Sequence, residues 1–401
     1  MTISAILPSA HQRLLAELAD ELRVLEDAGL ARRLTSLEAV HGPTVRIAGR
    51  ELVSWCSNDY LGLSTHPALS ESAASAAAEW GVGARASRLL AGTTRWHTRL
   101  EDSLAAWFGA EAALVYPSGY QANLGTLAAL LSSGDAVFVD HLAHASLIDA
   151  ARATRATLRV FPHNDVSCLA DLLSRAHAAR RRIIVTEGVF SMDGDQAPLA
   201  ALLEVADGHE AIIYLDDAHG TFVLGQTGRG TPEAAGIPHE RFLYMGTLGK
   251  ALGCQGGFVV GPQPLIDVLR NRARTFIYTT ALAVPVAAAA VAALDLLRAE
   301  PHRRELLHDR ARRLHESLTR LHLPALPAEM SHIIPVVVGL SQQALTLARQ
   351  LWERGIWAPA IRPPTVPEGT ARLRLSVTAL HTDTHIDALA DALQQALRSL
   401  S

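Results

Sequence analysis

The stretch AIIYLDDAHG, residues 211–220, joins an unbroken apolar run to a group of polar side chains. A run that is apolar through its length is typical of a strand with both faces buried. Further short β-rich runs share this pattern and are separated by helix-sized segments: AALVY 112–116, AVFVD 136–140, RIIVT 182–186 and GFVV 257–260. We therefore predict an α/β fold with a central, mostly parallel sheet that carries helices on both faces.

Several of these predicted strands end in a polar residue, namely Asp140, Thr186 and Asp216. In open α/β sheets, ligands bind outside the carboxyl ends of the strands. These three residues are therefore site candidates by position alone.

The composition is that of a globular protein, with 401 residues, 49% hydrophobic and 19% charged. The formal net charge is 36 − 40 = −4, which argues against a nucleic-acid-binding protein because such proteins carry a basic surface. Cys56, Cys168 and Cys254 are widely spaced, so neither a disulfide framework nor a thiolate zinc site is expected. Residues 1–23 lack the pattern of an export signal, and we expect a cytoplasmic protein.

The chain divides into three predicted parts. Leucines at helical spacing from Leu15 to Leu25 and a hairpin pattern around Gly49 make up a segment over residues 1–57. Residues 58–295 form the large domain, and the apolar run 281–294 within it is too short to span a membrane, which takes about 20 residues. Residues 296–401 form a smaller α+β domain with β-like runs at 332–339 and 371–377 and a closing helix over 386–397.

The segment MGTLGKALGCQGGF, residues 245–258, surrounds one lysine with glycines. A nucleotide P-loop would need Ser or Thr after the lysine, whereas Ala251 follows Lys250. Two interpretations stay open at this point: a surface turn, and a lysine that forms a Schiff base.

The end of the opening stretch has three interpretations. Asp216, Asp217 and His219, with His141 and His144, offer ligands for a divalent cation in a hydrolase. The same residues also suit a capped strand end or a cofactor contact, and the segment alone does not decide among them.

Two more strand ends run into polar turns. Ser191 in TEGVFSMDGD, residues 186–195, is a hydroxyl donor or an ordinary turn residue. In YPSGYQAN, residues 116–123, a helix begins near Gly119 and Tyr120, and helix N-termini bind anions. The string GVGARA at 81–86 follows a helical pattern instead of a strand, so it does not support NAD binding.

Taken together, these segments resemble the α-oxoamine synthases, a branch of the fold type I pyridoxal-phosphate enzymes. The resemblance extends over residues 30 to 380 and rests on ordered motifs: NDYLGL (58–63), SRLLAGTTRWHTRLE (87–101), SGYQAN (118–123), DHLAHASLIDA (140–150), TEGVFSMDGD (186–195), DDAHGT (216–221), GTLGKALG (246–253) and FIYTTA (276–281). It implies the type I fold, a sheet of the seven-stranded type and pyridoxal 5'-phosphate as the cofactor.

The resemblance implies roles for particular residues around the cofactor. Lys250 would hold it as a Schiff base, Asp216 would pair with its pyridine nitrogen, and His144 would stack on its ring. These three would be the catalytic residues. The remaining contacts would come from Gly119, Tyr120, Ser191, His219 and Thr247, and from Thr280, which would reach the phosphate of the neighbouring subunit in a homodimer.

The segment IRPPTVPEGTARLRLSVTA, residues 361–379, resembles the family members that condense L-alanine with a pimeloyl thioester. Arg374 would hold the amino-acid carboxylate. Arg32 and Thr365 would contact the acyl substrate, and Asn58 and His144 would lie near the reacting atoms. The rivals are a related acyl-CoA:glycine acyltransferase and, from another class, the metal-dependent hydrolase described above. We expect no metal, nucleic-acid or membrane partner, and the acyl carrier, CoA or a carrier protein, stays open.

Overall fold

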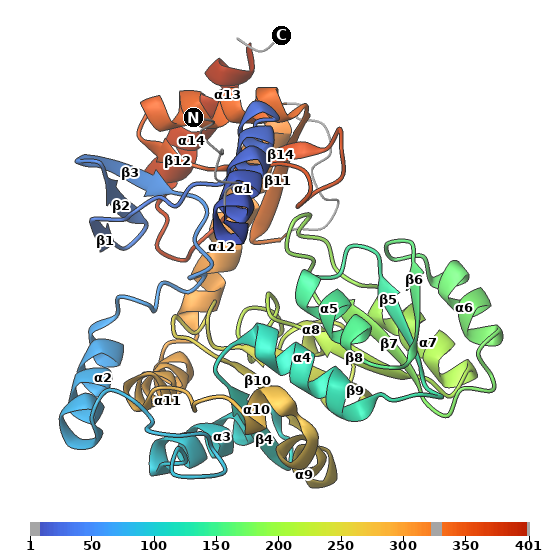
Figure 1. Ribbon diagram of the computed structural model, residues 1–401. Coiled ribbons are helices and arrows are strands. Elements are labelled where there is room, and N and C mark those ends of the chain that lie inside the picture. The colour runs from blue at the N-terminus through green and yellow to red at the C-terminus, as the bar shows by residue number, and fades with distance from the viewer. Residues whose placement is uncertain (1–8, 322–330, 399–401) are drawn as a thin grey trace, which may run out of the picture.

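The computed structural model describes residues 9–321 and 331–398. The first eight residues, on which the expectation about an export signal partly rests, lie outside this range. Figure 1 shows two lobes, one built on a large sheet and one that gathers the first and last parts of the chain. The helix α12 (His302–Arg320) runs from one lobe toward the other.

The large lobe contains a seven-stranded sheet in the order β4-β10-β9-β8-β7-β5-β6. Its strands are β4 (Ala112–Tyr116), β5 (Ala136–Asp140), β6 (Thr157–Phe161), β7 (Arg182–Glu187), β8 (Ile212–Asp216), β9 (Phe242–Thr247) and β10 (Gly257–Gly261). The pairs β6–β5, β5–β7, β7–β8 and β8–β9 are parallel, whereas β10 is antiparallel to both β9 and β4. The prediction of a mostly parallel sheet is confirmed.

Two strands of this sheet were absent from the sequence analysis. β6 lies at the sheet edge, where only Phe161 is buried, so the apolar run that marks a central strand is missing. β9 ends inside the glycine-rich segment that begins at Met245, and its buried residues were assigned to that segment. Along the chain, β6 lies between β5 and β7, and β9 lies between β8 and β10, all four of which were predicted.

Helices cover both faces of the sheet, as predicted, because alternate strand residues point to opposite sides. Val137, Val185 and Tyr214 pack on one side against a helical layer, while Phe138, Ile184 and Leu215 pack on the other. The first layer contains α4 (Gly119–Leu130), α5 (Ala145–Ala153), α9 (Gln263–Arg272) and α10 (Arg274–Ile277). The second contains α3 (Arg95–Phe108), α6 (Val166–Ser174), α7 (Leu199–Gly208) and α11 (Val284–Ala299).

Helix α11 confirms the interpretation of the alanine-rich run as a buried helix, since it packs against α3 and α2 (Pro67–Trp80). Within residues 9–321 and 331–398, no helix combines the length and apolar character needed to cross a bilayer. Two short helices follow β8: α8 (Thr231–Ala234) and a 3₁₀ turn (His239–Arg241).

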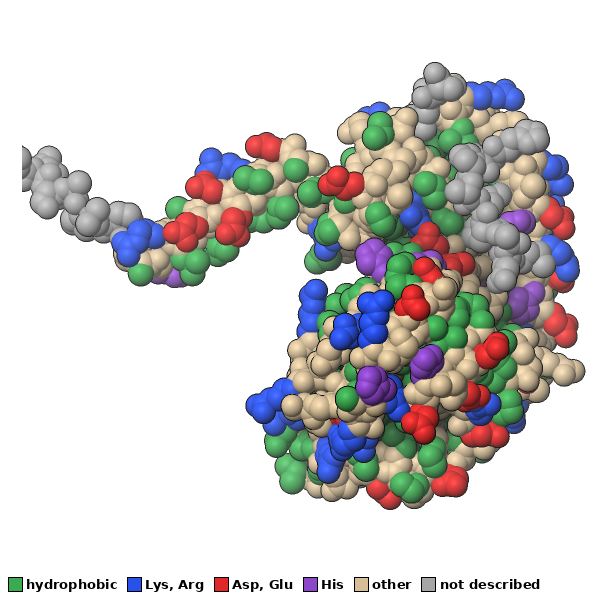
Figure 2. Space-filling view, turned by 90° about the vertical axis from the view of Figure 1, so that its right-hand side faces the viewer, with side chains coloured by type: hydrophobic (Ala, Val, Ile, Leu, Met, Phe, Trp, Pro, Cys, Tyr) green, Lys and Arg blue, Asp and Glu red, His purple; other side chains and the backbone are tan. Residues whose placement is uncertain are grey.

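The N-terminal part contains α1 (Ala10–Asp27), β1 (Ala39–His41) and the hairpin β2 (Thr44–Ile47) to β3 (Arg50–Ser54). The hairpin turns at Ala48 and Gly49, which both have positive φ (49° and 73°), the geometry of a type I′ turn. The predicted helix and hairpin are therefore confirmed. No α1 residue is buried, and Figure 2 shows the helix extending away from the body of the molecule.

The C-terminal part is α+β, as predicted. Its sheet has the order β11-β14-β13, and β12 instead adds to β3 as a parallel neighbour, so the two ends of the chain share a sheet. The elements are β11 (Ile333–Gly339), α13 (Ser341–Glu353), β12 (Ile356–Trp357), β13 (Ala360–Ile361), β14 (Ala371–Ser376) and α14 (Asp383–Arg398). The domain boundaries after residues 57 and 295 stay predictions.

Candidate active site

A cavity of about 180 Å³ opens at the carboxyl edge of the large sheet, where β7, β8 and β9 end at Glu187, Asp216 and Thr247. The edge is the one that the opening stretch of sequence indicated. Residues proposed from the sequence supply most of the lining: Gly119, Tyr120, His144, Asp216, His219, Thr247 and Lys250. The remainder, which the sequence analysis did not single out, are Asn123, Ser146, Glu187, Ala218 and Met245.

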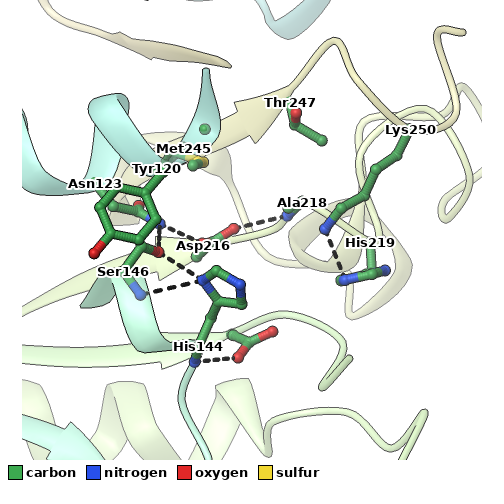
Figure 3. Close-up of a pocket in the computed structure, with 12 residues that line it drawn as sticks. Tyr120, Asn123, His144, Ser146, Asp216, Ala218, His219, Met245, Thr247 and Lys250 are labelled. Atoms are coloured by element: carbon green, nitrogen blue, oxygen red, sulfur yellow. Dashed lines mark hydrogen bonds between the residues drawn. The ribbon is translucent and has the colours of Figure 1, made fainter. Parts of the chain in front are cut away.

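Lys250 follows β9 in a turn that Thr247 holds in place. The Thr247 hydroxyl donates to the Gly256 carbonyl (2.8 Å) and accepts from the Gly249 N–H (3.1 Å). Lys250 Nζ lies 2.7 Å from His219 Nε2, and the two side chains point toward each other in Figure 3. Burial lowers the pKa of Lys250 to about 8, although the nearby carboxylates of Asp216 and Glu187 oppose that shift. Such an amine loses its proton readily, as a Schiff-base lysine must.

Asp216 is buried and held by two donors. Asn123 Nδ2 donates to its Oδ2 (2.7 Å), and the Ala218 N–H donates to its Oδ1 (3.0 Å). Tyr214 donates to the Asn123 carbonyl oxygen (2.8 Å), which fixes the orientation of the amide. A carboxylate stabilised in this way offers a fixed negative charge to a cationic ring nitrogen.

His144 caps the N-terminus of α5. Its Nδ1 accepts from the Ser146 N–H (3.2 Å) and lies 2.7 Å from Ser146 Oγ, and Asn123 donates to the same hydroxyl (2.8 Å). These contacts connect His144 to Asp216 through Ser146 and Asn123 (Figure 3). Burial lowers the pKa of His144, which favours a neutral ring suited to stacking and proton transfer.

The backbone of His144 is anchored by a buried carboxyl group. The His144 N–H donates to Glu187 Oε1 (2.6 Å), and Glu187 is the last residue of β7. Burial raises the pKa of Glu187 to about 8, and the negative charge of Asp216 adds to the shift. Glu187 therefore holds its proton more tightly than an exposed glutamate does.

Helix α4 begins at Gly119, beside the cavity, so its first N–H groups have no partner within the helix. The cap is Ser118, whose hydroxyl accepts from the Gln121 N–H (3.2 Å). The helix start packs closely on β10, because a Cβ at Gly257 would lie 2.6 Å from the Gly119 Cα. These features are suited to the binding of an anion such as a phosphate group.

A second, wider pocket of about 800 Å³ adjoins the first, and His144 lines both. Arg32 and Thr365 both line it, and Arg32 NH2 donates to Thr365 Oγ1 (3.4 Å). Ser191 lies here rather than in the smaller cavity. The fold therefore brings Arg32 and Thr365, two residues named from the sequence at opposite ends of the chain, into a single pocket.

Arg374, on β14, is 8% exposed and has no carboxylate partner within salt-bridge distance among the described residues. Its guanidinium donates to the Ser191 carbonyl, to Ser376 Oγ (2.7 Å) and to Asn58 Oδ1 (3.3 Å). A buried cation held only by neutral acceptors is suited to bind a substrate carboxylate. Arg374, Asn58 and Thr280 are not among the residues that line either pocket, and Thr280 is exposed.

The arrangement does not favour the metal-dependent hydrolase. Asp217 turns away from the cavity and binds Thr231 and Tyr244, whereas Asp216 binds Asn123 and His219 faces Lys250. Across the described parts of the chain, no cluster of three or more His, Cys, Asp or Glu side chains is placed to hold a metal ion.

Comparisons with known proteins agree with this geometry. Residues 50–393 match the family described as aminotransferase class I and II. The chain is 46% identical over 382 residues to the 8-amino-7-oxononanoate synthase of Azoarcus sp. (strain BH72), covering 95% of this chain and 97% of that protein. It is 47% identical over 380 residues to the enzyme of the same name from Anaeromyxobacter dehalogenans (strain 2CP-1 / ATCC BAA-258), covering 95% of each.

Solved structures give the same picture. A serine palmitoyltransferase variant from S. paucimobilis, solved with a PLP–myriocin adduct, superposes with a TM-score of 0.91 at 32% identity, over 97% of this chain and 98% of that one. The 8-amino-7-oxononanoate synthase from Francisella tularensis superposes with a TM-score of 0.76 at 27% identity, over 87% and 98%. The expected type I fold is confirmed. The chain belongs to the class I and II aminotransferase family and, within it, to the family of the 8-amino-7-oxononanoate synthases.

Proposed function

We propose that this protein condenses L-alanine with a pimeloyl thioester to give 8-amino-7-oxononanoate, carbon dioxide and the free thiol of the acyl carrier, a step of biotin biosynthesis in the cytoplasm. The observation that carries the proposal is the 2.7 Å approach of Lys250 Nζ to His219 Nε2 beside Asp216, in a chain nearly half identical to synthases of that name. The glycine-using relatives are the nearest alternative.

The residues of the smaller cavity fit pyridoxal 5'-phosphate. Lys250 would bind its aldehyde carbon, Asp216 its pyridine nitrogen, and the start of α4 at Gly119 and Tyr120 its phosphate together with Thr247. His219 and Ser191 would contact its phenolic oxygen, and His144 its ring face. When bound, this cofactor supplies an electron sink that stabilises negative charge at the alanine Cα.

Lys250 is then the base of the reaction. With a pKa lowered by burial, its amine takes the Cα proton of the substrate near neutral pH and returns a proton at the end of the cycle. His144, kept neutral by burial and aligned by Ser146 and Glu187, assists proton movement at the reacting carbonyl and during loss of the carboxylate.

The substrates are held by groups outside the small cavity. Arg374 binds the alanine carboxylate, and Asn58, which accepts from its guanidinium, keeps that group in position. The acyl chain extends through the wider pocket, where Arg32 and Thr365 contact it. A volume of about 800 Å³ is ample for a seven-carbon chain.

The proposal includes a homodimer in which Thr280 of one copy contacts the cofactor phosphate of the other. The exposure of Thr280 supports this role, since a residue of the same chain's cavity would be covered. An apolar stripe on α1 also supports a second copy, because Leu15, Leu18 and Leu22 are 52%, 43% and 59% exposed.

The test is direct. Protein loaded with pyridoxal phosphate is incubated with L-alanine or glycine and with pimeloyl-CoA or acetyl-CoA, and free thiol and product mass are followed. We expect turnover with alanine and pimeloyl-CoA, and none in Lys250→Ala. Preference for glycine and acetyl-CoA would instead establish the related acyltransferase, and chelator-sensitive hydrolysis by a colourless protein would establish the metal enzyme.

A further inference from the structure

Tyr60 lies directly behind His219, on the side away from Lys250. The tyrosine is fully buried, and its hydroxyl lies 2.6 Å from His219 Nδ1. The same hydroxyl is 3.2 Å from Asn58 Oδ1 and receives a hydrogen bond from Arg374 NH2 at 3.4 Å. The 2.7 Å contact between His219 Nε2 and Lys250 Nζ completes a hydrogen-bonded chain from the cavity to the carboxylate-binding arginine.

The protons in this chain can be counted. Burial lowers the pKa of His219 well below its usual value, and the positive charges of Lys250 and Arg374 add to the shift. His332 and His144 also face the ring and act in the same direction. The imidazole is therefore neutral and carries one N–H, while the tyrosine carries one O–H. With one proton on each group, these hydrogen bonds can run in two directions, and the Tyr60 O–H is donated to Asn58 Oδ1 in one and to His219 Nδ1 in the other.

In the first direction, protonated Lys250 donates to His219 Nε2. The ring proton then lies on Nδ1 and is donated to the Tyr60 oxygen, and the Tyr60 O–H is donated to Asn58 Oδ1. This direction suits the free amine, because an ammonium group has only donors to offer.

In the second direction, an acceptor faces His219 Nε2. The ring proton moves to Nε2, the Tyr60 O–H is donated to Nδ1, and Arg374 NH2 donates to the tyrosine oxygen. The phenolic oxygen of the cofactor is such an acceptor. Rotation of a single buried hydroxyl therefore accompanies the change of tautomer, and Arg374 and Asn58 supply a partner for that hydroxyl in each direction.

We propose that Tyr60 is a positioning residue whose hydroxyl sets the tautomer of His219 and reverses it when the phenolic oxygen of bound pyridoxal phosphate replaces the Lys250 amine opposite Nε2. This inference rests on the proposed function of the site. His332 holds the tyrosine ring in place through an edge contact at 4.3 Å, so the hydroxyl stays within reach of Nδ1 in both directions.

Loss of the hydroxyl affects the two tautomers unequally. In Tyr60→Phe, a proton on Nδ1 would be buried without an acceptor, whereas an unpartnered lone pair on Nδ1 costs less. The variant should therefore keep its proton on Nε2 with or without the cofactor, with the Nδ1–H form reduced by roughly tenfold or more. Its Lys250 amine would then lose the acceptor that it has in the cofactor-free protein.

The decisive measurement is the tautomer of His219 in full-length protein carrying ¹⁵N-labelled histidine, recorded at pH 7 with and without pyridoxal phosphate, with His219 assigned by difference from His219→Asn. In the unaltered protein we expect the proton on Nδ1 without cofactor and on Nε2 with it. In Tyr60→Phe we expect Nε2–H in both states. The same tautomer in both states of the unaltered protein would overturn the proposal, even if the variant failed to fold.

A second readout is the pH titration of the bound cofactor's absorbance. In Tyr60→Phe, Nε2–H loses the polarising hydrogen bond at Nδ1 and becomes a weaker donor, so the midpoint should move upward. The matched control is Tyr116→Phe, because Tyr116 is equally buried but makes no hydrogen bond to a described residue of the cavity. Equal midpoints in the two variants would contradict the proposal. If the unaltered protein did not take up the cofactor at Lys250, the proposed function would fail together with the role of Tyr60. If it took up the cofactor but the midpoints were equal, only the role of Tyr60 would fail.

Discussion

Asn123 Nδ2 lies 2.7 Å from Asp216 Oδ2 and also donates to Ser146, which contacts His144. One buried amide on α4 therefore orients both the carboxylate proposed to bind the cofactor nitrogen and the histidine proposed to cover its ring. The contact depends on Tyr214, whose hydroxyl fixes the other end of the amide.

Replacing Asn123 by Ala should weaken cofactor binding. The substitution removes a hydrogen bond to a buried carboxylate and leaves the Tyr214 hydroxyl without its partner. A hydrogen bond to a charged group contributes about 1.5–3 kcal/mol, so the dissociation constant for pyridoxal phosphate should rise roughly 10- to 100-fold. Titration of the cofactor absorbance measures this change. Ser146→Ala, which leaves Asp216 its donors, should have a smaller effect, and equal effects would contradict this assignment.

Capture of the cofactor should depend on pH through Lys250. Only the neutral amine attacks an aldehyde, and the pKa of Lys250 is lowered by burial to about 8, so the rate should rise with pH and level off above about 8. Stopped-flow absorbance after mixing cofactor-free protein with pyridoxal phosphate gives this profile. Because the charge of Asp216 raises the pKa of Lys250, Asp216→Asn should move the midpoint downward. A midpoint that stays in place or moves upward would show that this charge does not act on the amine.

Glu187 should make the cofactor-free protein less stable as pH rises. Its pKa is raised by burial from 4.5 to about 8, so the folded state binds a proton that the unfolded state releases. The stabilisation is fully present below about pH 4.5 and is lost progressively up to about pH 8. Melting temperatures of the unaltered protein and of Glu187→Gln, compared at several pH values from 5 to 9, test this. The difference between them should shift in favour of the variant as pH rises, and a constant difference would count against it.

The ion pair between Arg88 and Glu101 should be a main determinant of stability in the large lobe. Both side chains are buried and meet through two contacts of 2.8 Å, and Glu101 also accepts from the Val115 N–H in β4. Arg88→Met leaves a buried carboxylate without its cation, which costs about 3–5 kcal/mol. Urea unfolding followed by tryptophan fluorescence measures the loss.

An ion pair on the surface of the molecule serves as the control for Arg88 and Glu101. Arg95 and Glu79 form an ion pair 2.7 Å long whose side chains are 61% and 53% exposed. Glu79→Gln should change stability by about 1 kcal/mol or less, because solvent screens such pairs. Similar losses in Glu79→Gln and Arg88→Met would refute the role assigned to burial.

Most of the central sheet could be predicted from the sequence because parallel strands that are buried on both faces consist of continuous apolar residues. β8 and β5 are of this kind, with every residue or nearly every residue buried. β6 could not be found in this way, since this edge strand buries only Phe161 and lacks an apolar run. The antiparallel direction of β10 has no signal in its own residues, because it depends on the partners β9 and β4.

The site follows the same division. Lys250 and Asp216 stand out by residue type and position. The residues that were missed are ordinary polar side chains in motifs quoted because of their neighbours: Asn123, Ser146 and Glu187. A signal was present for Glu187, which follows Thr186 at a strand end already marked as a candidate. For Asn123 and Tyr60 the decisive property is the hydrogen-bond partner, on a distant segment, which only the fold supplies.

The two pockets described above have one described residue in common, His144. The smaller one is built from residues 119–250, and the larger one draws on Arg32 and on residues 363–368 at the other end of the chain. Mutations at Arg32 and residues 363–368 would therefore reshape the proposed acyl pocket without touching the groups proposed to hold the cofactor. On the proposed function, a lineage built on this scaffold could change the thioester that it accepts while its cofactor chemistry stays intact, and His144 and Ser191 are the positions where both demands must be met.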